Sequence, residues 1–165
     1  MKQKILVILT GGTIDSLTEL GKTGEKSYVK DYLKSLNLHI EFQFQQVCLK
    51  DSRNIDNQDK QTVVQMINNT KINDILITHG TFTMCEMAKY LTKHINNLNK
   101  KKIVLTGAME PLKNSLTNEA QFNLGFAIAT ILQSNPGIFI AINGKIFEAN
   151  NVYKNIDKGM FEELN

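Results

Sequence analysis

Short runs of apolar residues recur along the chain, and several end abruptly in glycine and hydroxyl-bearing residues. Two of them are Ile5 to Leu9, which runs into Thr10-Gly11-Gly12-Thr13, and Ile75 to Ile77, which runs into Thr78-His79-Gly80-Thr81. A strand that is apolar on both faces needs cover on both sides, as in a parallel sheet between two layers of helices. Glycine after such a run lets the backbone turn where a Cβ would clash. The runs therefore predict buried strands that end in tight polar turns.

Segments with helical periodicity lie between the predicted strands. The predicted helices span Tyr28 to Leu36, Asp56 to about Asn68, a stripe from Met84 to Leu98, and Asn118 to Leu132. Asp56 is in position to cap the second helix. Phe122 makes the fourth segment apolar nearly all round, so we expect that helix to be buried.

Three further strands complete one sheet. Alternation of apolar and polar residues from Ile40 to Gln45 is typical of a half-exposed edge strand, and a polar loop is expected from Leu49 to Asn54. Lys102 to Thr106 and Gly137 to Ile142 are the other two strands. Asn143-Gly144 then indicates a type I′ hairpin.

Strand and helix therefore alternate five times, which predicts an α/β fold with helices on both faces of a sheet. The edge character of the second strand favours an open, mostly parallel, flavodoxin-like sheet in the order 2-1-3-4-5, with a C-terminal β-hairpin at Asn143-Gly144. The tail from Glu148 is polar and weakly patterned.

Length and composition are those of one soluble globular domain, residues 1–165, with 42% hydrophobic and 21% charged residues. The net charge is only +3, and the one basic run, Lys100-Lys101-Lys102, is interpreted as a solvated turn, so no nucleic-acid partner is expected. Cys48 and Cys85 have no Cys-x-x-Cys spacing, which implies neither a zinc site nor a disulfide framework and favours the cytoplasm. Ile5 to Leu9 is too short to span a membrane, so no membrane partner is expected.

The carboxyl ends of the first four predicted strands carry small or hydroxyl-bearing residues: Thr13, Ser52, Thr81 and Ala108. In an open α/β sheet these positions line one crevice. Threonine attacks a substrate only when a base takes its proton, and lysine is that base only when its pKa is lowered. The candidate bases are three lysines, Lys145, Lys154 and Lys158, among which the sequence pattern does not choose. Helix capping and turn formation are the alternative roles of the threonines.

Other chemistries fit the sequence less well. The glycine turn after Leu9 lacks both G-x-G-x-x-G and G-x-x-x-x-G-K-[ST], and a long charged segment delays the next helix, so phosphate binding is a weaker reading. His79 is interpreted as a structural hydrogen-bonding residue, and His39 and His94 as surface positions. Cys85, near a helix start, is interpreted as a buried and inert thiol.

Three motifs, in chain order and at strand ends, resemble a known family. They are Thr10-Gly11-Gly12-Thr13-Ile14, Thr78-His79-Gly80-Thr81-x-Thr83-Met84, and Thr106-Gly107-Ala108-Met109-x-Pro111 followed by Phe122-Asn123-Leu124. Together they are similar to the N-terminal domain of bacterial-type L-asparaginases and glutaminase-asparaginases. This resemblance implies an amidohydrolase that needs no cofactor or metal and releases ammonia from side-chain amides through a threonine acyl-enzyme. The chain is expected to be that domain alone, without the family's C-terminal domain, and to self-associate.

The resemblance also assigns roles to individual residues. It makes Thr13 the primary nucleophile and Thr81 the second catalytic threonine, with Lys154 completing a triad with Thr81. It implies that Ser52 binds the substrate α-carboxylate and that the backbone carbonyl of Ala108 meets the scissile amide. The remaining substrate-binding positions are Gly12, Gly80 and Phe82.

The sequence departs from the family pattern at two places in the predicted site. Phe82 stands where the family has an aspartate that belongs to the triad and binds the substrate α-ammonium. The lid between Ser16 and Ser27 lacks the family's catalytic tyrosine, and Tyr28 lies too far along, at a helix start, to replace it. Activity on asparagine is therefore expected to be weak or altered.

Two functions from different classes follow. The first is an asparaginase-like amidohydrolase acting on asparagine or a related small amide through a threonine nucleophile. The second is a non-catalytic module that binds a small molecule, or another protein, on the same scaffold. Nucleotide binding at the glycine turn after Leu9 is a third and weaker alternative.

Overall fold

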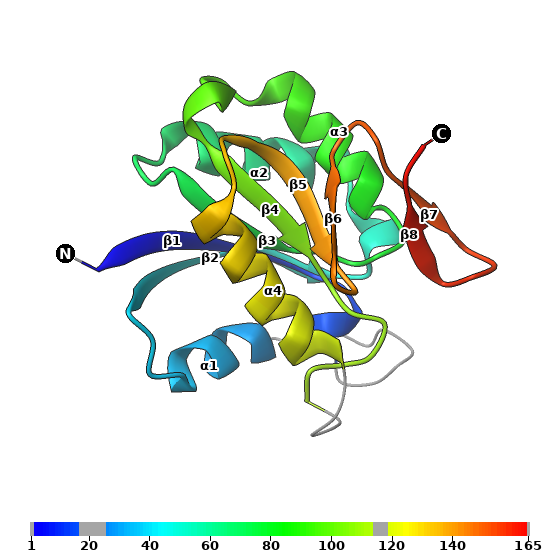
Figure 1. The fold of residues 1–165 in the computed structure, drawn as a ribbon, viewed down its shortest axis with the longest axis horizontal. Helices are drawn as coiled ribbons and strands as arrows, with labels where there is room; N and C mark the ends of the chain where they lie inside the picture. Colours follow the sequence, from blue (N-terminus) through cyan, green and yellow to red (C-terminus); the bar gives the residue numbers. More distant parts are fainter. Residues whose placement is uncertain (1, 17–25, 114–118, 165) are drawn as a thin grey trace.

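The computed structural model describes residues 2–16, 26–113 and 119–164. Its main feature is a six-stranded sheet in the order β2-β1-β3-β4-β5-β6 (Figure 1). The strands are β1 (Gln3–Gly11), β2 (Ile40–Lys50), β3 (Asp74–Thr78), β4 (Lys102–Thr106), β5 (Gly137–Ile142) and β6 (Lys145–Glu148). The first five are parallel, and β6 runs antiparallel to β5. The predicted flavodoxin-like sheet and its strand order are confirmed.

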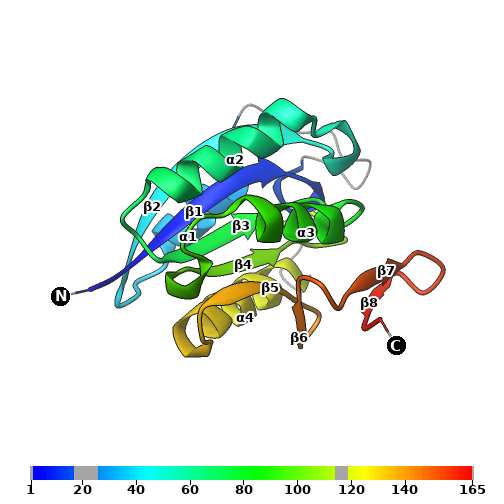
Figure 2. The same cartoon turned by 90° about the horizontal axis from the view of Figure 1, so that it is seen from above.

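Helices cover both faces of this sheet, as expected (Figure 2). Residues of α2 (Asn57–Asn69) and α3 (Met84–His94) form one core cluster, and residues of α1 (Tyr28–Ser35) and α4 (Glu119–Gln133) belong to the other. Successive side chains of a strand point to opposite faces. In β3, Ile75 and Ile77 accordingly join the first cluster and Leu76 the second, all with 0% exposure. Each such side chain contributes roughly 1.5–3 kcal/mol by its burial.

Local sequence signals account for several element boundaries. Asp56 accepts the backbone N–H of Asp59, and the Asp59 carboxylate accepts that of Asp56, which makes a capping box at the start of α2. Asn143 and Gly144 have φ values of 52° and 78°, as a type I′ turn requires, and they join β5 to β6. The predicted N-cap and the predicted hairpin are both confirmed.

Four expectations about these elements were wrong. α3 ends at His94, so Ile95 and Leu98 lie beyond it, and Leu98 begins the 3₁₀ turn η3 (Leu98–Lys100). β2 extends to Lys50, because it stays paired with β1 up to Gly11, so the polar loop begins only at Asp51. The other two expectations concern side chains rather than boundaries.

Phe122 and Lys101 have the opposite exposure from that expected. Phe122 is 57% exposed, because it stacks on Phe126 along the outer side of α4 instead of entering the core. Lys101 is only 6% exposed, since its ammonium donates to the backbone carbonyls of Thr70 and Ile72 at 2.8 and 2.9 Å. The basic run is therefore a solvated turn only in part.

A second small sheet follows the main one. β7 (Tyr153–Asn155) and β8 (Met160–Glu162) form an antiparallel hairpin, which the weak pattern after Glu148 did not predict. Figure 1 shows this hairpin beside the strand ends at which the candidate site lies. Phe161 of β8 is buried in the core cluster that also holds α2 and α3, which fixes the hairpin against the main domain.

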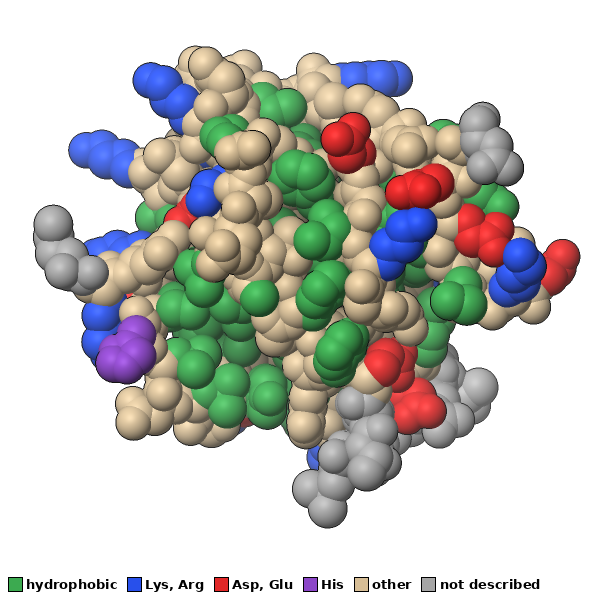
Figure 3. Space-filling view, in the orientation of Figure 1, with side chains coloured by type: hydrophobic (Ala, Val, Ile, Leu, Met, Phe, Trp, Pro, Cys, Tyr) green, Lys and Arg blue, Asp and Glu red, His purple; other side chains and the backbone are tan. Residues whose placement is uncertain are grey.

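Apolar side chains also gather on the outer surface over α1 and α4 (Figure 3). A groove of about 310 Å³ lies there, lined by residues that include Leu36, Leu38 and Ile128. Within the described part of the chain, no helix is long and apolar enough to cross a membrane.

Candidate active site

Three strand ends meet closely because glycines stand where they touch. A Cβ on Gly12, after β1, would lie 2.4 Å from the Cα of Gly80, after β3, and Gly12 has a φ of 83°. A Cβ on Gly80 would in turn lie 2.6 Å from Oγ of Ser52, after β2. These distances leave no room for any side chain. Glycine at positions 12 and 80 therefore allows the turns that carry Thr13, Ser52 and Thr81 to pack directly against one another.

A small pocket lies at this meeting point. It is lined by seven residues: Gly12, Thr13, Asp51, Ser52, Gly80, Thr81 and Phe82. Six of the eight residues proposed for the site from sequence thus lie on it, namely Gly12, Thr13, Ser52, Gly80, Thr81 and Phe82. The two others, Lys154 and Ala108, are placed by contacts of their own.

Lys154 reaches the pocket from the β7–β8 hairpin. Its Nζ lies 2.8 Å from Oγ1 of Thr81 and 3.8 Å from Sδ of Met109. Burial lowers the pKa of Lys154 below the ordinary lysine value, because desolvation disfavours the ammonium form. A lysine with a lowered pKa in contact with a threonine hydroxyl is the arrangement that base-assisted activation of that hydroxyl requires.

The other two candidate lysines are held elsewhere. Lys145 pairs with Glu163 at 3.2 Å, and Lys158 pairs with Glu162 at 2.7 Å. Both are exposed, and the contact with Glu162 raises the pKa of Lys158, which opposes a role as a neutral base. Of the three lysines, Lys154 is the one that contacts a residue lining the pocket, Thr81.

Phe82 lies at the rim of the pocket and is 49% exposed. Two cations face its ring: Lys154 Nζ lies 4.2 Å and the Arg53 guanidinium 4.6 Å from the ring centroid. Both distances are typical of cation–π contacts. Arg53 also donates from Nε and Nη2 to the two carboxylate oxygens of Asp51, at 3.0 and 2.7 Å, and this contact lowers the pKa of Asp51.

Ser52 and Thr13 are two hydroxyl-bearing residues that line the pocket. Ser52 is 3% exposed, and its Oγ has no hydrogen-bond partner among the described residues. Its backbone is fixed, since its carbonyl accepts Oγ1–H of Thr83 at 2.9 Å. A buried hydroxyl without a partner is costly unless a ligand or water satisfies it. Ser52 is therefore placed to bind a polar group that enters the pocket.

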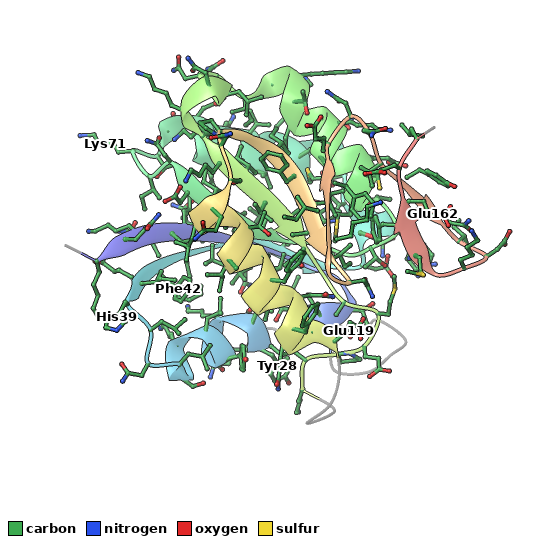
Figure 4. The ribbon with its side chains drawn as sticks, in the orientation of Figure 1. Tyr28, His39, Phe42, Lys71, Glu119 and Glu162 are labelled. Carbon is green, nitrogen blue, oxygen red and sulfur yellow. The ribbon has the colours of Figure 1, made fainter. Side chains whose placement is uncertain are left out.

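Thr13 opens the 3₁₀ turn η1 (Thr13–Asp15), which a buried carboxylate anchors. Asp15 is 0% exposed and accepts from Oγ of Ser27 and from the backbone N–H of Val29, both at 3.0 Å. Burial raises the pKa of Asp15. The turn bearing Thr13 is thus tied to the start of α1, beside which Figure 4 labels Tyr28. Asp15 was not singled out in the sequence, although an acid directly after the glycine turn is a usable signal.

Ala108 follows β4, is 1% exposed, and is not among the residues that line the pocket. Its neighbour Gly107 accepts Nδ2–H of Asn123 at 2.9 Å, and Asn123 Oδ1 accepts the backbone N–H of Asn143. Glu119, labelled at the start of α4 in Figure 4, accepts the backbone N–H of Met109. Two residues of α4 therefore fix the turn that carries Ala108 and Met109.

His79 and Cys85 have the inert character expected of them. Burial lowers the pKa of His79 to about 4, so the ring is neutral near pH 7, and its Nδ1–H donates to the Gly80 carbonyl at 2.8 Å. Burial raises the pKa of Cys85 to about 11, which keeps it a thiol. The expectation for the lid concerns residues 17–25, which lie outside the described residues.

Residues 4–160 of the chain match a family model described as "Asparaginase, N-terminal". The chain belongs to this asparaginase family. L-asparaginase 2 of Escherichia coli is 29% identical over 176 residues, which cover 98% of this chain and 49% of that protein. The chain spans about half the length of the curated relatives that it matches.

Solved asparaginase structures share the fold. The thermostable L-asparaginase from Thermococcus kodakarensis superposes with a TM-score of 0.84 at 29% identity, covering 99% of this chain and 52% of that one. A probable cytoplasmic L-asparaginase from Campylobacter jejuni gives a TM-score of 0.79 at 28% identity, covering 98% of this chain and 52% of that one. The resemblance inferred from the motifs is thus confirmed at the level of the family.

Proposed function

We propose that this asparaginase-family domain is an amidohydrolase that cleaves the side-chain amide of asparagine, or a related small amide, through a threonine nucleophile. The observation that carries the proposal is the 2.8 Å contact between Lys154 Nζ and Thr81 Oγ1 at the mouth of the pocket. Burial lowers the pKa of that lysine, which favours the neutral form that can accept a proton.

In the proposed reaction the Thr13 hydroxyl bonds to the amide carbon while the C–N bond breaks. Ammonia leaves with the proton that the hydroxyl gave up, and water then hydrolyses the resulting ester to the free acid. Thr81, which lines the pocket, and Lys154, which contacts it, transfer the protons of this reaction, and Ser52 binds the polar end of the substrate. The backbone carbonyl of Ala108, in the turn after β4, is proposed to contact the amide.

Phe82 sets the expected strength of this activity. An α-ammonium bound beside Phe82 would lack a carboxylate partner, and an unpaired buried charge costs roughly 3–5 kcal/mol, or about two to four powers of ten in binding. Turnover of asparagine is therefore proposed to be weak, and other amides are the better candidates.

The same residue motivates the second candidate function, a non-catalytic module that binds a small molecule on the asparaginase scaffold. Two observations support it. Phe82 has no carboxylate that could orient Lys154, which lies over its ring. The Ser52 hydroxyl has no hydrogen-bond partner among the described residues and so remains available to a ligand. Thermal-shift measurements with amino acids and dicarboxylates, run beside the activity assay, distinguish the two functions. Binding without turnover supports the module.

Assembly and location complete the proposal. We propose that residues 1–165 form one asparaginase N-terminal-like domain and that this domain self-associates. We also propose a cytoplasmic location, with no nucleic-acid or membrane partner. The exposed apolar groove over α1 and α4 supports self-association. Light scattering of the purified chain tests it, and a monomeric mass at all concentrations would contradict it.

The direct test of the function is ammonia release from L-asparagine, L-glutamine and amides without an α-amino group. We expect measurable release from at least one of them, and its loss in Thr13→Ala. Absence of release from every amide, with Thr13→Ala indistinguishable from the wild type, would reject the amidohydrolase.

A further inference from the structure

The charges around the pocket bear on which amide it accepts. Asp51 is the one acidic side chain among the described residues that line the pocket. Both of its carboxylate oxygens are occupied by Arg53, at 3.0 Å from Nε and 2.7 Å from Nη2. The backbone N–H of Arg53 is a further donor to Asp51 Oδ1, at 2.9 Å. Arg53 thus supplies three donors to the Asp51 carboxylate, which has about four acceptor sites, and its guanidinium offsets the negative charge that would attract a substrate ammonium.

Cations occupy the rim instead. The Arg53 guanidinium and the Lys154 ammonium each lie within 4.6 Å of the Phe82 ring centroid. A guanidinium has five N–H donors, of which two are directed at the Asp51 carboxylate, so others remain for an anion. The Arg53 side chain is 61% exposed and can adjust toward a ligand.

Ser52, which lines the pocket, also favours an anion. The Ser52 hydroxyl, 3% exposed, is without a hydrogen-bond partner among the described residues and can donate to a carboxylate oxygen. Arg53 is the next residue in the chain, so the hydroxyl and the guanidinium belong to one turn, η2 (Ser52–Asn54). A carboxylate held there would meet two donors, whereas an ammonium held there would be repelled by the permanently charged Arg53 guanidinium.

We propose that the site takes small anionic amides that carry a carboxylate but no α-ammonium, the monoamides of short dicarboxylic acids, with Arg53 as a specificity-determining residue. This inference rests on the proposed amidohydrolase function and names its substrate class. Repulsion between like charges is a common way to exclude a wrong substrate, and here the positive charge of Arg53 would repel the α-ammonium of asparagine. Succinamate differs from asparagine only in lacking the α-ammonium, so the pair isolates this one group.

The experiment compares kcat/KM for succinamate and L-asparagine by ammonia release, in the wild type, in Arg53→Gln and in the control Lys145→Gln. The expected result is at least about a tenfold preference for succinamate in the wild type. Arg53→Gln should lower kcat/KM for succinamate at least about threefold and narrow the preference. Lys145→Gln should change neither kcat/KM for succinamate nor the preference over asparagine, because Lys145 pairs with Glu163 on the surface.

Calorimetric titration with the product-like acids succinate and L-aspartate separates this inference from the proposed function. Tighter binding of succinate than of L-aspartate, weakened by Arg53→Gln, supports the ligand class even if no amide is hydrolysed. Equal or tighter binding of L-aspartate overturns it. Preferred hydrolysis of asparagine over succinamate would also overturn it, while leaving the amidohydrolase function intact.

Discussion

The two sides of the candidate site differ in how firmly the fold holds them. On one side Thr81 is 4% exposed and its hydroxyl contacts Lys154, while the adjoining turns pack so closely that a Cβ at position 12 or 80 would clash. On the other side Phe82 is 49% exposed, and Arg53 meets it from the surface. Side chains in the buried half are fixed by packing, whereas position 82 can change without disturbing the core. Substitutions at position 82 can therefore change the contacts made to a substrate and to Lys154 without disturbing the packing of the buried half.

The largest expected effect comes from the buried half. Thr81→Val keeps the shape of the side chain but removes the hydroxyl that Lys154 contacts, so we expect about a thousandfold loss of kcat in ammonia release. The matched control is Thr92→Val, whose hydroxyl donates only to the Ala88 carbonyl within α3. Equal activity of Thr81→Val and Thr92→Val would mean that the Thr81 hydroxyl has no special role in the reaction.

A smaller effect is expected from restoring an acid in the exposed half. Phe82→Asp gives a substrate ammonium a carboxylate partner and gives Lys154 an acceptor, so kcat/KM for asparagine should rise about tenfold to a hundredfold. The neutral control is Phe82→Asn, which has a similar size and no charge. If neither variant changes asparagine turnover, position 82 does not limit recognition.

The pH dependence provides a finer test of the buried half. Lys154 acts as a base only when neutral, and burial lowers its pKa below 10.5, so more of it is neutral at a given pH than in a free lysine. The rate of ammonia release should therefore rise with pH, about tenfold per unit below that lowered pKa, and level off above it. A rate that stays flat from pH 6 to 9 would contradict this role.

The smallest expected effects are on protein stability, and unfolding measurements compare the two halves of the site. In Gly80→Ala the new Cβ would lie 2.6 Å from Ser52 Oγ, which should cost about 1–3 kcal/mol of the free energy of unfolding. Phe82→Asn, at the exposed rim, should shift the midpoint of thermal unfolding far less. Similar shifts in both variants would show that the rim is as constrained as the glycine turns.

Much of the fold could be predicted from the sequence, because buried parallel strands leave a direct pattern. The apolar runs at Ile5–Leu9 and Ile75–Ile77, the alternation after Ile40 and the Asn143-Gly144 turn were enough to order the sheet. Phe122 misled because an apolar residue in an apolar helix was assumed to be buried, whereas it stacks outside on Phe126. Lys101 was expected to be solvated, but its ammonium donates to two backbone carbonyls that only the folded chain brings together.

The site was predictable only where backbone chemistry leaves a local signal. Glycines followed by threonines marked the turns after β1 and β3, and both turns line the pocket. Choosing Lys154 over Lys145 and Lys158 needed a contact between residues 73 positions apart, made by a hairpin with almost no sequence pattern. Arg53 was overlooked because its importance depends on the Asp51 carboxylate and the Phe82 ring together.

The most direct measurement of the central claim compares two lysines of the same hairpin. Lys154 contacts the Thr81 hydroxyl, and Lys158 pairs with Glu162, so Lys154→Met and Lys158→Met remove similar charges a few residues apart. With ammonia release from succinamate and asparagine as the readout, Lys154→Met should lose about a hundredfold to a thousandfold in kcat, while Lys158→Met stays close to the wild type. If Lys154→Met retains full activity, or if both variants lose it equally, Lys154 is not the base of a threonine-dependent amidohydrolase.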